Sequence, residues 1–201
     1  MPEIRIVDYG VGNLLSLKVA LEKTGLAATI ATPAQKLREA DAIALPGVGN
    51  FSAAAEALKP IKSDLVDIAK SGTPILGICL GLQLFFEASE EGPGEGLAFF
   101  KGKDIRLTGQ VKVPHMGWNA LNIVKQNELF EGINDGAYVY FVHSLYPVPE
   151  DKEIICTQTE YGETFTSAVA NKNVYGTQFH PEKSGDIGLK ILKNFARMVI
   201  K

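Results

Sequence analysis

Short apolar runs alternate with amphipathic stretches over the first 87 residues, and this alternation constrains the fold more than any other feature. The apolar runs have the length of buried strands and cover residues 4–7, 28–31, 42–45 and 74–78. The stretches between and after them have helical spacing and cover residues 13–24, 51–58, 61–70 and 80–87, with Pro60 between the second and the third. Strands that alternate with helices favour right-handed crossovers, so the sequence predicts a parallel sheet with helices on both faces.

The pattern changes after residue 87. Residues 90–96 form a loop rich in glycine and acidic residues, and the chain then reads as short strands and turns to about residue 177. The clearest of these strands cover residues 137–142, 153–159, 165–169 and 174–178. A last amphipathic stretch predicts a helix over 186–200. No repeat or long linker divides the chain. The sequence therefore predicts one α/β domain, residues 1–201, whose mainly parallel sheet gains antiparallel strands in its C-terminal half.

Composition and charge exclude several classes of function. The chain has 46% hydrophobic and 21% charged residues, as ordinary soluble domains do. A net charge of −3 leaves no basic field for nucleic acid, and the apolar runs are too short to span a bilayer. The first residues enter a strand without a secretory signal pattern, and Cys79 and Cys156 do not form a secreted disulfide framework. These features predict a cytoplasmic protein.

Cys79 lies where an apolar strand runs into a helix, with Gly77 and Gly81 two residues to either side. This is the thiol version of the nucleophile elbow, in which a sharp turn pushes the nucleophile out of the sheet and needs small neighbours. The dipole of the following helix would favour the thiolate, and the Leu80 N–H would bind an oxyanion. On the elbow alone, a buried structural cysteine is an equally good interpretation. Cys156, within a strand-like run, is interpreted as structural.

A thiol nucleophile needs a base and a group that orients the base. The chain has three histidines, His115, His143 and His180, and His180 follows directly on the predicted strand 174–178. That position lies at the carboxyl edge of the sheet, where Cys79 is also expected. Glu182 comes two residues later and can accept the imidazole N–H, although alone it would be read as a solvated turn residue.

Two glycine-rich loops follow predicted strands at the same edge. Pro46-Gly47-Val48-Gly49-Asn50 opens a helix, and its backbone N–H groups can line an oxyanion hole. A phosphate-binding loop is the alternative, but it would need a lysine and a hydroxyl residue that are missing here. Gly10 and Gly12 resemble the start of a dinucleotide motif whose third glycine position is Leu15, so they predict a tight surface turn instead.

Other candidate residues depend on context. Gln83 lies one helical turn after Cys79 and can face the same pocket, where its amide could pair with an amide ligand. Glu91 could bind a cationic amino group, although Glu87, Glu90 and Glu95 are equally available. The aromatic segments 114–119 and 139–146 suit either an interface or a core. The histidines show no metal-ligand spacing, so no metal or cofactor is expected.

Several motifs resemble a known family. Residues 77–83, Gly-Ile-Cys-Leu-Gly-Leu-Gln, together with Phe-His-Pro-Glu-Lys at 179–183, are similar to the class I, triad-type glutamine amidotransferases. Within that class, segments 46–49, 114–119 and 140–144 resemble the glutaminase subunits of imidazole glycerol phosphate synthases, which act in histidine biosynthesis. The resemblance extends from segment 8–13 to the last helix, with no departure at a catalytic position.

The resemblance implies a three-layer, flavodoxin-like fold and a complete mechanism. Cys79 would attack the glutamine amide and form a thioester, His180 would move protons, and Glu182 would orient His180. The implied oxyanion hole consists of Val48, Gly49 and Leu80. The implied glutamine-binding residues are Gly49, Gln83, Glu91, His143 and Ser144. No cofactor is implied.

The resemblance also implies a partner, a separate (β/α)8-barrel cyclase that receives the ammonia and forms a heterodimer with this chain. It would turn a formimino carboxamide nucleotide into imidazole glycerol phosphate and aminoimidazole carboxamide ribotide. The candidates for the docking face are Asn13, Trp118 and Tyr140. If the Val48 segment is mobile, its N–H would complete the oxyanion hole only after the loaded cyclase docks. The alternatives are a different amidotransferase subunit, a stand-alone cysteine hydrolase, and a non-catalytic module, which should have lost part of the triad.

Overall fold

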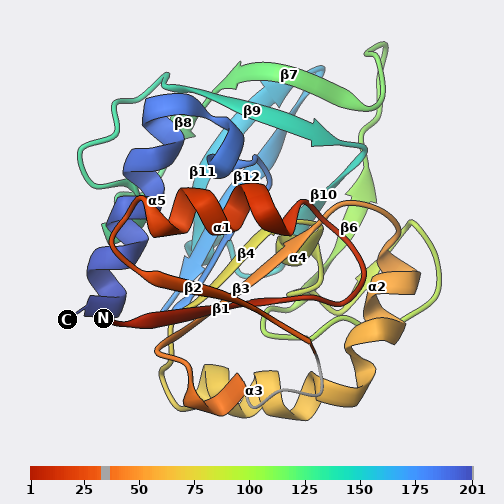
Figure 1. Cartoon of the computed structure of the whole chain (residues 1–201). Helices are drawn as coiled ribbons and strands as arrows, with labels where there is room; N and C mark the ends of the chain where they lie inside the picture. Colours follow the sequence, from red (N-terminus) through yellow and green to blue (C-terminus); the bar gives the residue numbers. More distant parts are fainter. Residues whose placement is uncertain (33–36, 201) are drawn as a thin grey trace.

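The computed structural model describes residues 1–32 and 37–200 as a three-layer α/β fold (Figure 1). The central sheet has eight strands in the order β2-β1-β3-β4-β13-β12-β11-β8. Its parallel part consists of β2 (Ala27–Ala31), β1 (Glu3–Val7), β3 (Ala42–Gly47), β4 (Ile75–Cys79) and β13 (Val174–Thr177). Its antiparallel part consists of β12 (Glu163–Asn171), β11 (Ile155–Tyr161) and β8 (Asn122–Ile123). The predicted fold class is therefore confirmed, including the antiparallel strands of the C-terminal half.

Two hydrophobic layers cover the faces of the sheet. Alternate residues of β3 point to opposite sides: Ala42 and Ala44 pack in one core, Ile43 and Leu45 in the other. The first core contains apolar residues of α1 (Leu14–Glu22) and α5 (Gly185–Ile200). The second contains those of α2 (Phe51–Leu58) and α3 (Lys62–Lys70). Figure 1 shows α1 above the first strands and α3 below them.

The predicted elements of the first half are confirmed except for one helix. Pro60 lies in a 3-10 turn, η2 (Lys59–Ile61), between α2 and α3. The prediction of a helix over 80–87 is wrong, because α4 ends after one turn (Leu80–Gln83). The carbonyls of Leu84 and Phe85 accept hydrogen bonds from the backbone N–H groups of Leu97 and Phe100, at 2.6 and 3.1 Å. The N–H groups of Phe85 and Phe86 bind the carbonyls of Leu82 and Gln83, so the hydrogen bonds after α4 are of the 3-10 type and the α-helix does not continue.

In the second half the structure adds elements that the sequence pattern did not predict. They are β5 (Ala88–Ser89), β6 (Gly102–Arg106), β7 (His115–Ala120), β8, β10 (Leu145–Pro149) and the 3-10 turns η3 (Glu128–Phe130), η4 (Lys152–Ile154) and η5 (Pro181–Lys183). The 3-10 turn η1 (Leu37–Glu39), in the first half, was not predicted either. Strand β11 begins at Ile155 rather than at the predicted residue 153, because η4 precedes it. Strand β13 ends at Thr177, one residue earlier than predicted.

Two small sheets flank the central one. One has the order β10-β6-β5, and the other pairs β7 with β9 (Tyr138–His143) in antiparallel register. Figure 1 shows β7 and β9 crossing above α1 and α5. Within the central sheet, Gly47 of β3 pairs with Cys79 of β4, and Thr177 of β13 pairs with Ile78. The loops after β3, β4 and β13 therefore meet at one edge.

Candidate active site

Cys79 ends β4 in a backbone conformation that side chains rarely adopt. Its φ is 56° and its ψ −109°, and it is 5% exposed. The two flanking glycines have no room for a side chain. A Cβ on Gly77 would lie 2.5 Å from the Phe85 ring, and one on Gly81 would lie 1.7 Å from the carbonyl oxygen of Leu45. The strained nucleophile elbow that the sequence predicts is thus present.

His180 and Glu182 form a buried pair beside this elbow. His180 Nδ1 lies 2.8 Å from Glu182 Oε1, and both side chains are 4% exposed. Burial lowers the pKa of His180, but hydrogen bonding to and charge interaction with Cys79 and Glu182 outweigh it and raise the pKa to about 9. Nε2 makes no hydrogen bond of normal geometry, although Cys79 is near enough to shift this pKa. The arrangement leaves Nε2 free to exchange a proton with the sulfur.

Strand β9 holds the turn that carries His180. The His180 backbone N–H donates to the Tyr140 carbonyl at 2.9 Å. Tyr140 N–H donates to Ser184 Oγ at 2.9 Å, and this hydroxyl donates to the His180 carbonyl at 2.6 Å. The sequence pattern did not identify Ser184, because a serine after a Pro-Glu-Lys turn is usually a simple turn residue.

The Cys79 sulfur has two further polar neighbours. It donates to the Val142 carbonyl at 3.6 Å and accepts from Gln178 Nε2 at 3.6 Å. Neither residue was among the predicted site residues. The signal for Gln178 was its position two residues before His180 in an extended segment, where both side chains point to the same side. Because α4 has only four residues, the predicted helix dipole at the sulfur is that of a single turn. Individual hydrogen-bond donors therefore contribute more than the helix dipole to stabilising negative charge on this sulfur.

A cavity of about 220 Å³ opens beside Cys79. All of the predicted oxyanion and glutamine-binding residues line it: Val48, Gly49, Leu80, Gln83, Glu91, His143 and Ser144, together with Pro114, Val142 and Leu145. Pockets for drug-sized ligands measure roughly 300–1,000 Å³, so this one suits a smaller metabolite. The structure therefore brings together residues from segments far apart in the sequence.

The loop after β3 lies at the rim of this cavity. Val48 is 41% exposed, and Gly49 has a φ of 127°, which an L side chain rarely adopts. Tyr9 and Asn50 hold the two ends of the loop. The Tyr9 hydroxyl donates to the Pro46 carbonyl, and Asn50 Oδ1 accepts from Ala53 N–H at 3.0 Å. Val48 and Gly49, whose N–H groups belong to the predicted oxyanion hole, line the cavity between these anchors.

His143 and Gln83 meet at the Leu145 carbonyl. His143 Nδ1 and Gln83 Nε2 both lie 2.9 Å from this oxygen, so both atoms donate to it. His143 Nε2 then accepts from His115 Nδ1, at 3.1 Å. Burial lowers the pKa of His143 to about 3 and that of His115 to about 4. Both imidazoles are therefore neutral near pH 7, and neither competes with His180 as the base.

Among the four candidate glutamates, only Glu91 lines the cavity. Its carboxylate accepts from Phe51 N–H at the start of α2. Glu87, Glu90 and Glu95 instead bind Gly102 N–H, Lys103 and Lys62. The sequence missed Asp104, which is fully buried with no partner for either carboxylate oxygen. Burial, and then the charge of Glu91, raise the Asp104 pKa well above its usual value.

The three docking candidates lie on two parts of the surface. Trp118 and Tyr140 pair across β7 and β9, with ring centroids 6.1 Å apart, and Trp118 is 55% exposed. Asn13 is exposed and caps α1, since its Oδ1 accepts from Ser16 N–H at 3.1 Å. A cleft lined by Leu15, Glu182 and Gly185 joins α1 to the catalytic turn.

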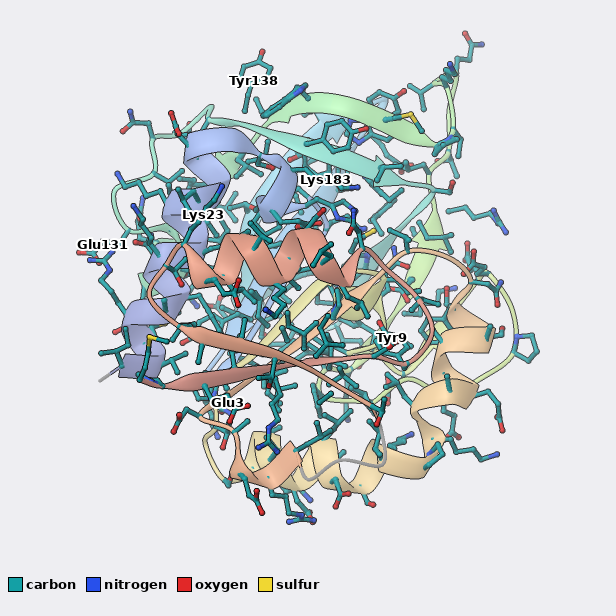
Figure 2. All side chains as sticks on the ribbon, viewed as in Figure 1. Glu3, Tyr9, Lys23, Glu131, Tyr138 and Lys183 are labelled. Carbon is teal, nitrogen blue, oxygen red and sulfur yellow. The ribbon has the colours of Figure 1, made fainter. Side chains whose placement is uncertain are left out.

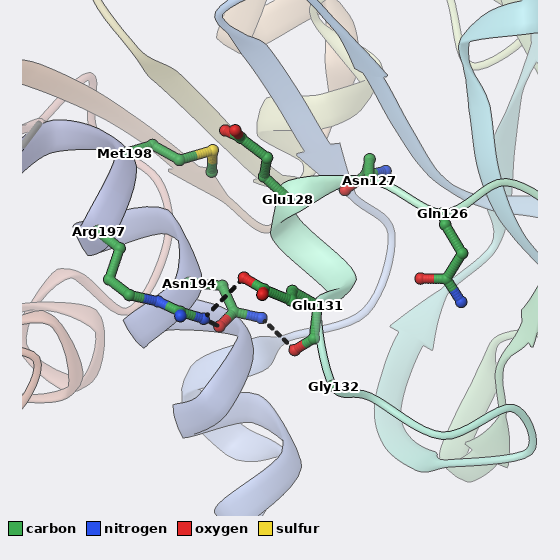
Figure 3. A pocket seen from close by; sticks show the side chains of 8 residues that line it. All are labelled: Gln126, Asn127, Glu128, Glu131, Gly132, Asn194, Arg197 and Met198. Atoms are coloured by element: carbon green, nitrogen blue, oxygen red, sulfur yellow. Dashed lines mark hydrogen bonds and ion pairs between the residues drawn. The ribbon is translucent and has the colours of Figure 1, made fainter.

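A larger cavity lies away from this site, between η3 and α5 (Figure 3). Its volume is about 530 Å³, and none of its eight labelled residues is a cysteine or a histidine. Its Asn194 joins the two elements by donating to the carbonyls of Leu129 and Glu131. Residues 1–32 and 37–200 contain no cluster that could hold a metal ion, and no helix among them is long and apolar enough to cross a membrane.

Comparison with known proteins places these features in a family. The profile of the family described as glutamine amidotransferase class-I matches residues 5–199. The chain is 49% identical over 200 residues to the imidazole glycerol phosphate synthase subunit HisH of Pyrococcus furiosus, covering 98% of this chain and all of that protein. It is 48% identical to the HisH subunit of Methanocaldococcus jannaschii over 197 residues, covering 98% of this chain and all of that protein.

Solved structures agree on the fold. The structure of PurLQS from Thermotoga maritima superposes with a TM-score of 0.80 at 21% identity, covering 100% of this chain and 99% of the other. At that identity the likeness concerns the fold alone. The family match covers nearly the whole chain, and the relatives match it from end to end. The chain belongs to the class-I glutamine amidotransferase family.

Proposed function

We propose that this chain is the glutaminase subunit of an imidazole glycerol phosphate synthase, which hydrolyses glutamine to glutamate and ammonia for histidine biosynthesis. One observation carries the proposal: Cys79, in a strained elbow beside the buried His180–Glu182 pair, opens onto a small cavity. That cavity is lined by every residue expected to bind glutamine. Identity of 45–49% to several HisH subunits over nearly the whole chain supports the choice of this subfamily. We treat residues 1–201 as one catalytic domain.

The reaction would begin with the proton of the Cys79–His180 pair held on His180 Nε2, which the raised pKa of His180 favours. The thiolate attacks the amide carbon of glutamine, and the oxygen becomes an oxyanion that the N–H groups of Leu80 and Gly49 or Val48 stabilise. His180 returns the proton to the amide nitrogen, so that the C–N bond breaks and ammonia leaves a glutamyl thioester on Cys79. Glu182 accepts the Nδ1–H of His180, which fixes the tautomer and the ring orientation.

Water completes the cycle. His180 removes a proton from water, the hydroxide attacks the thioester, and the thiolate leaves as glutamate forms. Glu91, at the cavity wall, offers the negative charge that would bind the substrate ammonium group, and Gln83, His143 and Ser144 surround the rest of the molecule. The neutral His143 suits this role, because a charged imidazole would compete with the substrate ammonium for Glu91.

The ammonia would pass to a separate cyclase subunit with a (β/α)8-barrel fold. The exposed apolar residues beside the catalytic turn suit such a docking face: Leu15, Val19, Met116, Trp118 and Tyr138 are each at least 44% exposed. Figure 2 shows Tyr138 projecting outward from β9. Docking there would let the partner act on the Val48 loop, and losing one oxyanion donor can cost ~2.7–4 kcal/mol of transition-state stabilisation. We place the complex in the cytoplasm, because a catalytic thiol needs a reducing compartment.

The test is glutamate release from glutamine by the purified chain, alone and with the cyclase and its nucleotide ligand. We expect almost no glutamate release by the chain alone and strong glutamate release in the presence of the cyclase with its nucleotide ligand bound. Cys79→Ala should abolish that activity, whereas Cys156→Ala should keep it, because Cys156 is buried in β11 away from the cavity. Equal activity in both conditions would instead favour a stand-alone hydrolase. No activity in either would remove the assignment.

A further inference from the structure

Gln178 is a buried polar residue that the mechanism above does not use. It is the first residue after β13, is fully buried, and its backbone N–H donates to the Ser167 carbonyl at 2.8 Å. Phe179, the next residue, packs into the core against the rings of Phe130 and Phe141. In an extended segment this places Gln178 on the opposite side, which is the side of the sulfur. The backbone thus fixes where the Gln178 side chain points.

The orientation of the Gln178 amide follows from a backbone carbonyl. The end of Gln83 that lies 2.9 Å from the Leu145 oxygen must be its NH2 group, because a carbonyl oxygen only accepts. The same NH2 group lies 3.1 Å from the side chain of Gln178, so the atom of Gln178 facing it must be the oxygen. The other end of the Gln178 amide, at 3.6 Å from Cys79 Sγ, is therefore a donor.

We propose that Gln178 is a positioning residue for the nucleophile, donating a hydrogen bond from its amide to Cys79 Sγ and so favouring the thiolate over the thiol. The inference deepens the glutaminase mechanism and rests on that proposed function. In the thiol state the sulfur donates to Val142 O and accepts from Gln178. Once His180 takes the proton, the contact with the Val142 carbonyl loses its hydrogen, while the Gln178 contact becomes a charge-assisted bond.

This change in hydrogen bonding stabilises the sulfur only when it is negatively charged. The thioester sulfur carries no negative charge, so the Gln178 bond stabilises the attacking thiolate and the thiolate that leaves during hydrolysis. The short α4 helix makes such a donor important at this elbow. Gln83 then has a second role besides lining the cavity. It donates to the Gln178 oxygen and thereby orients the Gln178 NH2 group toward the sulfur.

The experiment measures the alkylation rate of Cys79 by iodoacetamide against pH, without glutamine or partner. Every protein in the comparison also carries Cys156→Ser, so that Cys79 is the only thiol that iodoacetamide can alkylate. Gln178→Met keeps the side-chain length but removes the donor. We expect the midpoint of the rate profile to rise by about one pH unit, and the rate at neutral pH to fall roughly tenfold. The titratable groups around the sulfur, His180, Glu182, Tyr9 and His143, are unchanged between the proteins.

Two further variants keep the test decisive. Gln178→Glu preserves shape but places a carboxylate oxygen against the sulfur, so its midpoint should rise further; it also decides the matter if Gln178→Met does not fold. Asn194→Leu removes a buried amide far from the site, which donates to the carbonyls of Leu129 and Glu131 at 2.9 Å each. It should lower stability and leave the alkylation profile unchanged.

A folded Gln178 variant with the wild-type profile would overturn the proposal, as would an equal shift in Asn194→Leu. With the loaded partner present, Gln178→Met should lower kcat and leave the KM for glutamine nearly unchanged. An unchanged kcat beside a shifted alkylation profile would also overturn it. Because alkylation does not involve glutamine, failure of the glutaminase assignment would leave this profile as it is, so the two failures can be told apart.

Discussion

The backbone N–H of His180 donates to the carbonyl of Tyr140 at 2.9 Å. Strand β9 therefore holds the proposed catalytic base, and two residues further along, at Val142, the same strand contacts the Cys79 sulfur. Tyr140 also pairs with the exposed Trp118 across β7. One strand thus connects the proposed docking face with both the base and the nucleophile, and a displacement of β9 would reach both groups.

Ser184→Ala should damage this connection. The variant leaves Tyr140 N–H and one acceptor site of the His180 carbonyl without their buried hydroxyl partner, which should cost about 2 kcal/mol or more in the free energy of unfolding. Partner-stimulated glutaminase activity should fall as well, because His180 loses its support. Urea unfolding and glutamate release are the measurements. Ser71→Ala is the control: its hydroxyl lies at the exposed end of α3, where it donates to the Ile68 carbonyl and accepts from the Thr73 hydroxyl. Equal effects of the two substitutions would contradict this role of Ser184.

Glu182→Gln should change how stability depends on pH. The pKa of His180 is raised from 6.5 to about 9, so its contribution to stability is fully present below pH 6.5 and is lost as pH rises through about 9. At ~1.4 kcal/mol per pH unit, this amounts to about 3 kcal/mol, shared between the effects of Cys79 and Glu182. The variant should lose less free energy of unfolding than the wild type as pH rises from 6.5 to about 9. The measurement is the urea midpoint at a series of pH values, and an unchanged slope would speak against the ion pair.

Asp104→Val should stabilise the protein at neutral pH. Burial and Glu91 raise the Asp104 pKa above 3.8, so the wild type loses stability as pH rises from about 4, where the unfolded chain ionises and the folded chain does not. Removing an unpaired buried carboxyl should gain about 1–3 kcal/mol at pH 7, and the gain should shrink toward pH 4. Thermal or urea unfolding at both pH values measures it. A variant less stable than the wild type at pH 7 would show that Asp104 has a compensating partner.

Trp118→Ala should weaken coupling to the partner without affecting the fold. Its ring is 55% exposed, so little folding energy is lost, but a central aromatic of a docking face can contribute about 2 kcal/mol or more to binding. We expect a higher cyclase concentration for half-maximal glutaminase activity. Val124→Ala removes another exposed apolar side chain, 47% exposed, from beside β8 at the far edge of the central sheet, and serves as the control. Equal cyclase titrations for the wild type and Trp118→Ala would exclude Trp118 from the interface.

Much of the site was predictable because its signals are local. The glycines beside Cys79 and the Glu182 that follows His180 lie within a few residues of the groups they serve, so the two motifs taken together indicate the elbow and the base. The continuous apolar runs of β3 and β4 likewise predict buried parallel strands, whose carboxyl ends must share an edge. The prediction of a helix over 80–87 was wrong because the backbone hydrogen bonds of Phe85 and Phe86 are of the 3-10 type and the chain at Leu97 and Phe100 binds the carbonyls that follow. The spacing of residues within 80–87 does not reveal these contacts.

By itself, the sequence predicted the alternating strands and helices of the first half, a cysteine as the nucleophile and His180 as its base, since each prediction depends on neighbouring residues. Residue spacing left four glutamates equally available, and the tertiary structure places Glu91, which the resemblance implied, at the cavity. The tertiary structure alone decided that Asp104 is buried near Glu91 and what contacts the sulfur. Val142 is 63 residues from Cys79 and Gln178 is 99 residues from it. Such contacts arise when distant strands pair, and strand register is a property of the whole packed sheet rather than of any short segment.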